Sequence, residues 1–299
     1  MPPIRVTGLF IYPVKSLRGY SVASAELDPF GFVGDRRFLI VDPTGKFLTQ
    51  RALPRMALIN ARLSPGTLTI SAIGAGSISI PTASDPAAPL RAVSVWKSEG
   101  LQAEDCGIAA SAWLSTFLGL TCHLVRIGEK FSRANLKSAA RTGDNVSFAD
   151  ACPFLLISAA SLANLNDRIQ ENHGEPVPMN RFRPNLIVEG CAAFAEDTWT
   201  RIRIGPAATG GAAPSPRSSR AEGGAAPDDG IIFRSAGKSD RCIITTTDQL
   251  TGERGKEPLK TLATFRRGEP DPTAVYFGVN LIHETKTGTL QLGDTLDLL

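Results

Sequence analysis

The sequence has few of the residues that build common metal and disulfide sites. It contains three histidines and five cysteines, and the cysteines lie far apart at positions 106, 122, 152, 191 and 242. No two of them form a C-x-x-C pair, and only one histidine, His123 after Cys122, lies beside a cysteine. This pattern fits neither a disulfide framework nor a structural zinc site. Each cysteine is therefore interpreted by default as a small buried hydrophobic residue.

Long apolar runs and blocks of like charge are also missing. No run could span a bilayer, and the opening residues MPPIRVTGLFIYPVKS resemble neither a signal peptide nor a transit peptide. The 32 basic and 29 acidic residues give a net charge of +3 without the dense basic stripe typical of nucleic-acid binders. We therefore expect a soluble, intracellular protein, cytoplasmic unless it associates with an organelle, with no membrane segment and no nucleic-acid partner.

The chain is long enough, at 299 residues with 42% hydrophobic content, to bury a large core. Short β-like runs fill the first part and are separated by turns at 42–45 and 64–66. This spacing predicts a β-barrel-like domain over 1–105, followed by a mixed α/β domain over 106–299. The fold class is thus α+β and mostly β.

Helical periodicity begins after Cys106. GIAASAWLSTFLGL and SAASLANLNDRIQENHG each place apolar residues on one helical face, with Ser158 as the N-cap of the second, and a third helix is expected in EPLKTLATFRRG. Further strands are expected at NLIVEG, TRIRIG, CIITTT and GTLQLGDTLDLL. Residues 206–230 are rich in Ala, Gly, Pro and Ser and are predicted to be a disordered insertion.

Four groups of polar residues stand at expected strand ends or turns. They are Lys15 and Ser16 in YPVKS, Arg36 and Arg37 in GDRRF, Arg181, Arg183 and Asn185 in NRFRPN, and Arg241 and Cys242 in SDRCIITTTD. A cation beside a hydroxyl suits an anionic oxygen, arginines two apart on an extended segment share a face, and a cation beside a cysteine favours its thiolate. Each group alone is equally compatible with a solvated turn or strand edge. Together they predict a pocket for an anionic cofactor plus a thiolate.

The motifs YPVKS, GDRRFLIV, DACPFLLIS, NRFRPNLIVEG and RCIITTTDQLTGE, in this order, resemble the MOSC-domain molybdenum enzymes of the amidoxime-reducing component family. The resemblance covers nearly the whole chain outside 206–230, and it implies an N-terminal MOSC β-barrel domain followed by a MOSC domain. It also implies a molybdenum cofactor, Mo-molybdopterin, whose metal is ligated by Cys242.

The family's cofactor-holding motifs fall on a further set of residues in this sequence. They are Lys15, Ser16, Arg36, Asp150, Arg183 and Asn185, with Arg241 and Asn185 as donors that orient the ligand. Asp240 departs from the family pattern, which has a small uncharged residue two positions before the cysteine.

The resemblance further implies reduction of small N-hydroxylated substrates such as amidoximes and hydroxylamines. Electrons would come from cytochrome b5 and NADH-cytochrome b5 reductase, because the sequence shows no haem, flavin or iron–sulfur motif. Asp248 or a water is the expected proton donor. The alternatives are a sulfur-transfer enzyme, although cofactor sulfurases also carry a pyridoxal-phosphate domain, and a cofactor carrier. A cysteine hydrolase is disfavoured because no histidine lies in the four groups.

Overall fold

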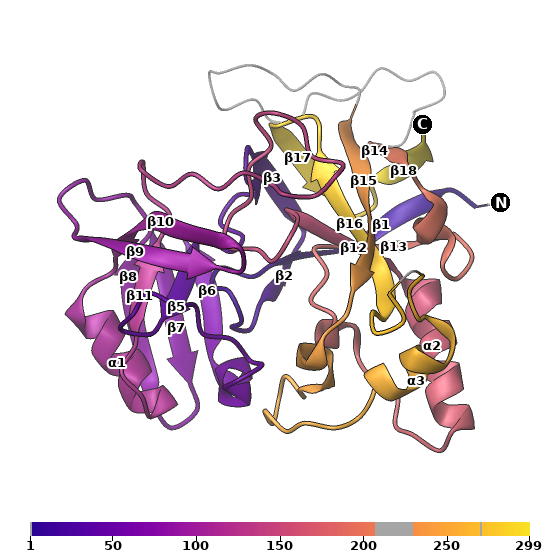
Figure 1. Ribbon diagram of the computed structural model, residues 1–299. Coiled ribbons are helices and arrows are strands. Elements are labelled where there is room, and N and C mark those ends of the chain that lie inside the picture. The colour runs from indigo at the N-terminus through magenta and orange to yellow at the C-terminus, as the bar shows by residue number, and fades with distance from the viewer. Residues whose placement is uncertain (1, 207–229, 270) are drawn as a thin grey trace.

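The computed structural model describes residues 2–206, 230–269 and 271–299. Strands predominate in the described residues, and three α-helices accompany them: α1 (Ile108–Leu118), α2 (Ala159–Glu171) and α3 (Leu259–Phe265) (Figure 1). Four short 3-10 helices are η1 (Pro54–Leu58), η2 (Met179–Arg181), η3 (Ala195–Thr198) and η4 (Ile243–Thr246). The mostly β, α+β fold class is confirmed. The insertion predicted at 206–230 lies, for residues 207–229, outside the described residues.

A closed barrel of seven strands dominates the C-terminal part. In spatial order these are β13 (Leu186–Glu189), β12 (Phe154–Ser158), β16 (Tyr276–His283), β15 (Ile231–Asp240), β14 (Arg201–Gly205), β18 (Thr295–Leu298) and β1 (Ile4–Ile11), and β1 pairs with β13 to close the ring. The short β2 (Tyr20–Val22) continues from β1. The first strand of the chain therefore lies among the last ones, as Figure 1 shows.

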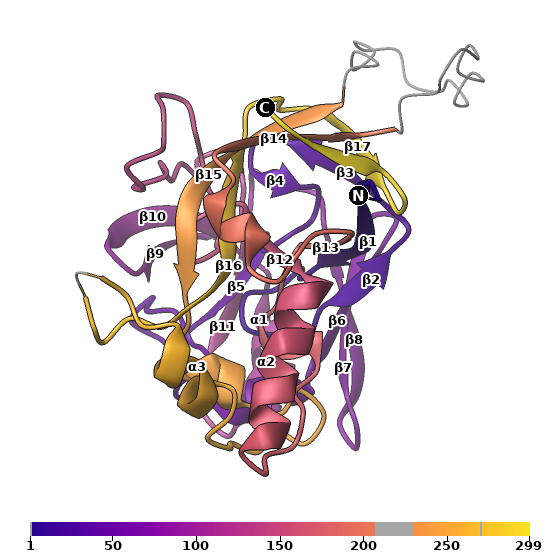
Figure 2. The same cartoon turned by 90° about the vertical axis from the view of Figure 1, so that its right-hand side faces the viewer.

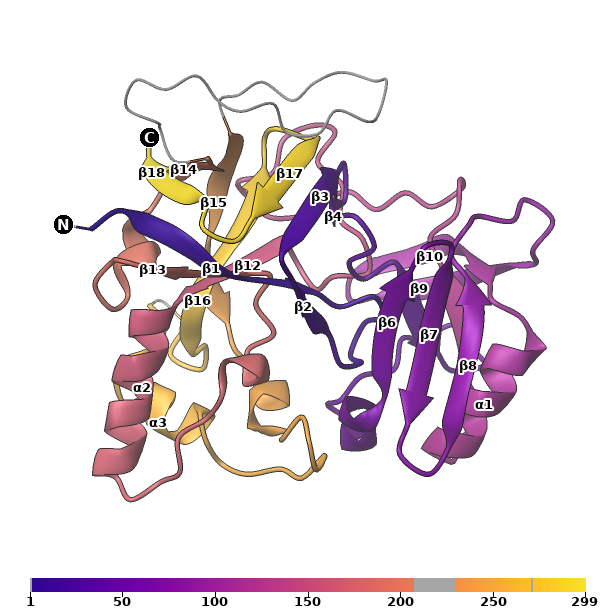
Figure 3. The same cartoon turned by 180° about the vertical axis from the view of Figure 1, so that it is seen from behind.

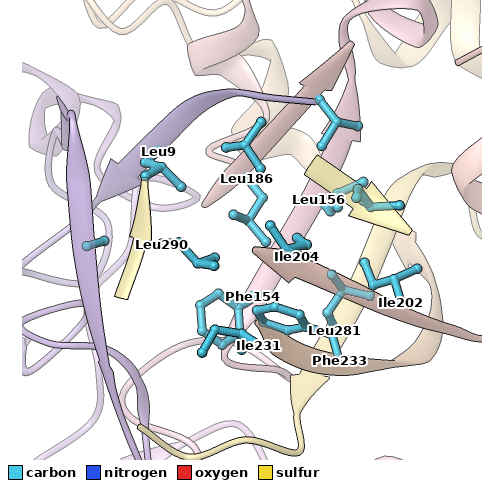
Figure 4. Close-up of a cluster of buried hydrophobic side chains, with 14 of the residues drawn as sticks. Leu9, Phe154, Leu156, Leu186, Ile202, Ile204, Ile231, Phe233, Leu281 and Leu290 are labelled. Carbon is cyan, nitrogen blue, oxygen red and sulfur yellow. The ribbon is translucent and has the colours of Figure 1, made fainter. Parts of the chain in front are cut away.

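The barrel interior is filled by apolar side chains from strands far apart in the sequence. Leu9, Leu186 and Phe233 are fully buried there, and the ring of Phe154 meets that of Phe233 edge-on at 5.2 Å (Figure 4). Alternating apolar residues of each strand point inward because successive side chains of a strand face opposite sides. The barrel is a packed core, so a ligand has to bind outside it.

The N-terminal part packs smaller sheets around its own core. One sheet has the order β5 (Phe38–Val41), β11 (His123–Arg126), β10 (Ser98–Asp105) and β9 (Leu90–Val95), and another contains β6 (Asn60–Ser64), β7 (Thr67–Ala72) and β8 (Gly76–Pro81) (Figure 3). A third sheet joins β17 (Gly288–Gln291) to β3 (Ser24–Asp28) and β4 (Gly31–Phe32), and its buried side chains, such as Leu27 and Leu290, pack into the core of the barrel instead.

Helix α1 belongs to this N-terminal part. Its residues Ala110, Leu114 and Phe117 share a core with Phe38 and Leu68. The boundary predicted at 105/106 therefore does not coincide with a break between cores, and the division of the chain there stays a prediction.

Helix α2 begins as its sequence predicts. The Ser158 hydroxyl accepts a hydrogen bond from the amide of Ser161, and Leu165 and Ile169 are buried. The helix connects β12 to β13, which pair in parallel, a topology that requires a crossover connection. Helix α3 packs beside α2 on the outside of the barrel (Figure 2).

Two local predictions are wrong. The segment CIITTT is not a strand, because Ile243–Thr246 forms η4, where the hydroxyls of Thr245 and Thr246 donate to the carbonyls three residues earlier. Such side-chain bonds to the local backbone compete with sheet pairing and override β-branched propensity. The segment around Arg181 is not extended either, because Met179–Arg181 forms η2 and Arg183 has φ of 58°.

Candidate functional site

A cavity of about 840 Å³ lies between the two parts of the molecule. All eight residues expected to hold the cofactor line it: Lys15, Ser16, Arg36, Asp150, Arg183, Asn185, Arg241 and Cys242. Strand pairing accounts for much of this convergence. The end of β1 and the starts of β12 and β13 meet at one rim of the barrel, since β1 runs antiparallel to β13 and β12 runs parallel to it.

Lys15 and Asp150 form an ion pair in the cavity wall. The Lys15 side chain is 6% exposed, and burial lowers its pKa although Asp150 opposes this. Burial would raise the pKa of Asp150, but the Lys15 ammonium and the Trp96 indole N–H, which donates to Asp150 Oδ1 at 2.9 Å, hold that pKa well below its ordinary value. The Asp150 side chain is 58% exposed, so water screens the pair and it adds little stability.

Arg36, Asn185 and Arg183 form a second group around Tyr12. Arg36 Nη1 donates to Asn185 Oδ1 at 2.9 Å, and both guanidinium groups lie over the Tyr12 ring, 4.3 and 4.4 Å from its centroid. Burial raises the pKa of Tyr12 to about 12, so the phenol is neutral and donates to the Pro184 carbonyl at 3.0 Å. Burial also lowers the pKa of Arg183 to about 10, which leaves it charged at neutral pH.

Two buried donors in this wall have no partner among the described residues. Within the described part of the chain, Arg183 Nη2 and Arg241 Nε are buried without a hydrogen bond, although Arg183 Nη1 donates to the Leu17 carbonyl at 2.6 Å. An unsatisfied buried N–H is costly unless a ligand accepts from it. Nine lysines and arginines but only two aspartates line the cavity. The donor set therefore fits an anionic ligand with hydrogen-bond acceptors, as a phosphorylated pterin is.

Cys242 contributes a thiol to the same cavity. Two residues after β15 ends, it lies at the N-cap position of η4, and its Sγ accepts a hydrogen bond from Arg51 Nε at 3.3 Å. The Arg51 guanidinium stacks on the Trp96 ring, 4.3 Å from its centroid. Arg241, in contrast, turns to Ser239 and the Phe182 carbonyl. The hydrogen-bonding cation at the thiol is thus Arg51 rather than the neighbouring arginine.

Neither Arg51 nor Trp96 was expected from the sequence, since each stands alone outside the polar groups. Arg51 is held in place by the other half of the molecule. The side-chain amides of Gln50 and Gln249 bond each other reciprocally at 3.2 and 3.0 Å, and Arg254 donates to the carbonyls of Gln50 and Arg51. No local pattern signals such a contact between residues about 200 positions apart.

Backbone conformation offers one signal that the structure alone reveals. Six described residues other than glycine have positive φ, and four of them line the cavity: Ser16, Arg36, Trp96 and Arg183. The left-handed region is unfavourable for residues with a Cβ, and such strain concentrates at ligand sites. The cavity wall is therefore the most strained part of the described backbone.

Two residues of the predicted polar groups, Arg37 and Arg181, and the expected proton donor, Asp248, lie outside the cavity. Arg37 pairs with Asp28 at 2.5 Å, and Arg181 pairs with Asp248 at 2.8 Å. Burial would raise the pKa of Asp248, but the amides of Leu250 and Thr251 and the nearby Arg181 hold it below its ordinary value. A carboxylate so placed is a poor proton donor at neutral pH.

Two further acidic or thiol groups belong to the cavity wall. Asp240 accepts a hydrogen bond from the Val275 amide at 3.2 Å. Cys152 is buried, and burial raises its pKa to about 11, so it is a neutral thiol. Across the described residues, no cluster of three or more His, Cys, Asp or Glu side chains is placed to hold a metal ion. A metal bound at Cys242 would need its other ligands from a cofactor.

The two parts of the chain correspond to two known domain types. Residues 3–121 match the MOSC N-terminal beta barrel domain, and residues 143–297 match the MOSC domain. Mitochondrial amidoxime-reducing component 1 of Mus musculus is 33% identical over 98% of this chain and 82% of its own length, and the Homo sapiens protein of that name is 31% identical with the same coverage. The chain therefore belongs to the MOSC-domain amidoxime-reducing component family.

A relative with a different name shares the same region. Molybdenum cofactor sulfurase of Danio rerio is 31% identical over 94% of this chain, which corresponds to 32% of the sulfurase. None of the described helices has the length and apolar character needed to cross a membrane.

Proposed function

We propose that the protein is a molybdenum-cofactor-dependent reductase of N-hydroxylated compounds such as amidoximes and hydroxylamines, which receives electrons from cytochrome b5 and its NADH-dependent reductase. The observation that carries the proposal is the convergence on one cavity of the Cys242 thiol and the buried donors of Arg183 and Arg241. Relatives named amidoxime-reducing component support it.

The residues of the cavity wall would hold the cofactor, ligate its metal and orient the ligand sulfur. Arg36, Arg183, Asn185 and Arg241 would hold the anionic and heteroaromatic parts of the cofactor through charge-assisted hydrogen bonds. Cys242 would ligate the metal, and the molybdenum cofactor, when bound, would supply the two electrons for reduction of the N–O bond.

Arg51 and Trp96 would orient the ligand sulfur. The Arg51 Nε–H donates to Sγ, and its stacked, planar guanidinium leaves little freedom to turn away. With Asp248 outside the cavity, we propose water as the source of the proton required at the substrate oxygen.

The test is metal and pterin analysis of the purified protein together with turnover of benzamidoxime by a chemical reductant. We expect stoichiometric molybdenum and measurable reduction, and loss of reduction in Cys242→Ser. Protein that carries no molybdenum when produced in a host that makes the cofactor would refute the proposal.

The second candidate is sulfur transfer or storage of the cofactor, which the similarity to a molybdenum cofactor sulfurase favours. Cys242→Ser separates the candidates. A variant that retains the cofactor but loses amidoxime reduction supports catalysis at Cys242. A carrier would keep its cofactor and would show no N-reduction in either form.

A further inference from the structure

Three lysines line the outer part of the cavity and have no role in holding the cofactor. They are Lys46, Lys97 and Lys137. Lys46 and Lys97 are exposed and Lys137 is half-buried, whereas the residues proposed to hold the cofactor are largely buried. No carboxylate of the described residues pairs with any of the three ammonium groups. Asp42 interacts electrostatically with Lys46, but its carboxylate accepts a hydrogen bond from the Thr44 hydroxyl instead of forming an ion pair.

The three lysines come from neighbouring segments. Lys97 lies in the turn of the β9–β10 hairpin, which points toward the barrel in Figure 1, and the segment of Lys46 bonds this hairpin through Ser94 N to Gly45 O at 3.0 Å. Arg133 Nε donates to Ser98 Oγ at 3.1 Å and ties the segment that contains Lys137 to the same turn. The positive charges therefore gather on one side of the cavity.

Exposed apolar side chains line the same cavity as these charges and the thiol. Trp96 is 40% exposed and Leu136 is 69% exposed, and both line the cavity beside the lysines. Large apolar side chains that remain exposed within a cavity are typical of a surface that contacts a ligand. The Trp96 ring is fixed by its N–H bond to Asp150 and by Arg51, so it offers a rigid wall.

We propose that this outer part of the cavity is a subsite for an anionic substituent of the substrate. The inference rests on the proposed function and deepens it, because it names the substrate class as N-hydroxylated compounds with an apolar body and a carboxylate or phosphate. The N-hydroxyl group faces Cys242, the body packs on Trp96 and Leu136, and the anionic group meets the lysines. An acidic protein docked on the rim is the rival, but the lysines share one cavity with the thiol, which favours a small molecule.

The test compares benzamidoximes of nearly equal size that carry a para carboxylate, carboxamide or trimethylammonium group. The measured quantity is the ratio of kcat/KM for the carboxylate to that for the carboxamide, at low ionic strength and with a chemical reductant as electron donor, so that no protein has to dock. We expect a ratio of about five to twenty for the unmodified protein and the reverse preference for the cation, because each exposed charge pair contributes modestly. The ratio should fall toward one at high salt.

The variant is Lys46→Gln/Lys97→Gln/Lys137→Gln, which should bring the ratio close to one. The matched control is Lys130→Gln/Lys256→Gln/Lys260→Gln, which removes three exposed lysines outside the cavity and should keep the ratio. An equal fall in both variants would mean a long-range effect of net charge and would overturn the subsite.

Four other results overturn the proposal in distinguishable ways. Equal turnover of all three substrates by the unmodified protein removes the subsite and leaves the reductase intact. Loss of molybdenum from the triple variant assigns the lysines to the cofactor. An unchanged ratio with slower reduction by cytochrome b5 assigns them to docking. No turnover of any substrate by molybdenum-loaded protein refutes the proposed function, and the subsite with it.

Discussion

Arg51 provides the sharpest perturbation of the proposed site, because it reaches the thiol from the opposite half of the molecule. Its Nε lies 3.3 Å from Cys242 Sγ, and its guanidinium stacks on Trp96. Arg51→Gln removes the charge and the planar fork but keeps most of the side-chain length. Arg51→Lys keeps the charge but cannot stack and donate in the same geometry.

The structure sets the size of the effect. A hydrogen bond to a charged group contributes about 1.5–3 kcal/mol, and the stacked ring adds roughly 0.5–1 kcal/mol at a partly exposed site. Arg51 is half-buried, so solvent screening favours the lower end, about 1.5 kcal/mol. We therefore expect Arg51→Gln to lower cofactor affinity roughly ten-fold, with Arg51→Lys between it and the unmodified protein.

The assay is molybdenum and pterin per protein after dialysis, followed by kcat/KM for benzamidoxime per bound molybdenum. Arg55→Gln is the matched control, because the Arg55 guanidinium also stacks on an aromatic ring, Phe117 at 4.3 Å, but lies outside the cavity. It should behave as the unmodified protein. If Arg51→Gln retains the cofactor and its kcat/KM lies within two-fold of that of the unmodified protein, the hydrogen bond from Arg51 to the thiol contributes nothing to function and our reasoning is wrong.

Three further predictions concern the thiol, the anion site and a buried histidine. Cys242→Ser should abolish amidoxime turnover, whereas Cys152→Ala should keep molybdenum and activity, since Cys152 is a neutral buried thiol; metal loss from the latter would show that we chose the wrong ligand. Arg183→Ala should lose cofactor about ten-fold or more by metal analysis, while Arg181→Ala, outside the cavity, should retain it. Burial and then Lys286 lower the pKa of His283 to about 4 from 6.5, so its unfolded form binds a proton first as pH falls. The free energy of unfolding, measured with urea, should therefore drop by about 3 kcal/mol between pH 6.5 and 4, and His283→Gln should flatten that slope.

The helices could be predicted because their signals are local. Ser158 caps α2 with the amide three residues ahead, and Leu165 and Ile169 recur on one face. The strand predicted after Cys242 is wrong because the conformational preference of threonine is ambiguous. Its β-branched side chain favours strands, but its hydroxyl can also bond a carbonyl three residues earlier, and in η4 the second effect prevails.

The cavity wall could be predicted in part, since four groups of polar residues at strand ends and turns coincide with family motifs, although each group alone would also suit a solvated turn. Arg51 and Trp96 could not be predicted, because tertiary contacts between distant parts of the chain bring them to Cys242. The segment of Arg51 docks through the Gln50–Gln249 amide pair, and Trp96 reaches Asp150 only when the β9–β10 hairpin meets the start of β12. Sequence periodicity carries no information on such contacts between the two halves.

Backbone strain in the cavity wall leads to a final prediction, at Ser16. This residue is 6% exposed and has φ of 65°, a conformation that costs a residue with a Cβ roughly 1–2 kcal/mol. Ser16→Ala and Ser16→Gly both remove the hydroxyl, but only glycine relieves the strain, and its greater freedom in the unfolded chain offsets part of the gain.

In the cofactor-free protein, urea unfolding should therefore find Ser16→Gly more stable than Ser16→Ala by roughly 0.5–1 kcal/mol. Both variants should lose a similar amount of cofactor, because both lack the same donor. Equal stability of the two variants would show that the backbone at position 16 is not strained. A stability gain from glycine together with cofactor loss would mean that the backbone conformation of Ser16 lowers the free energy of unfolding but places the hydroxyl where the cofactor needs it.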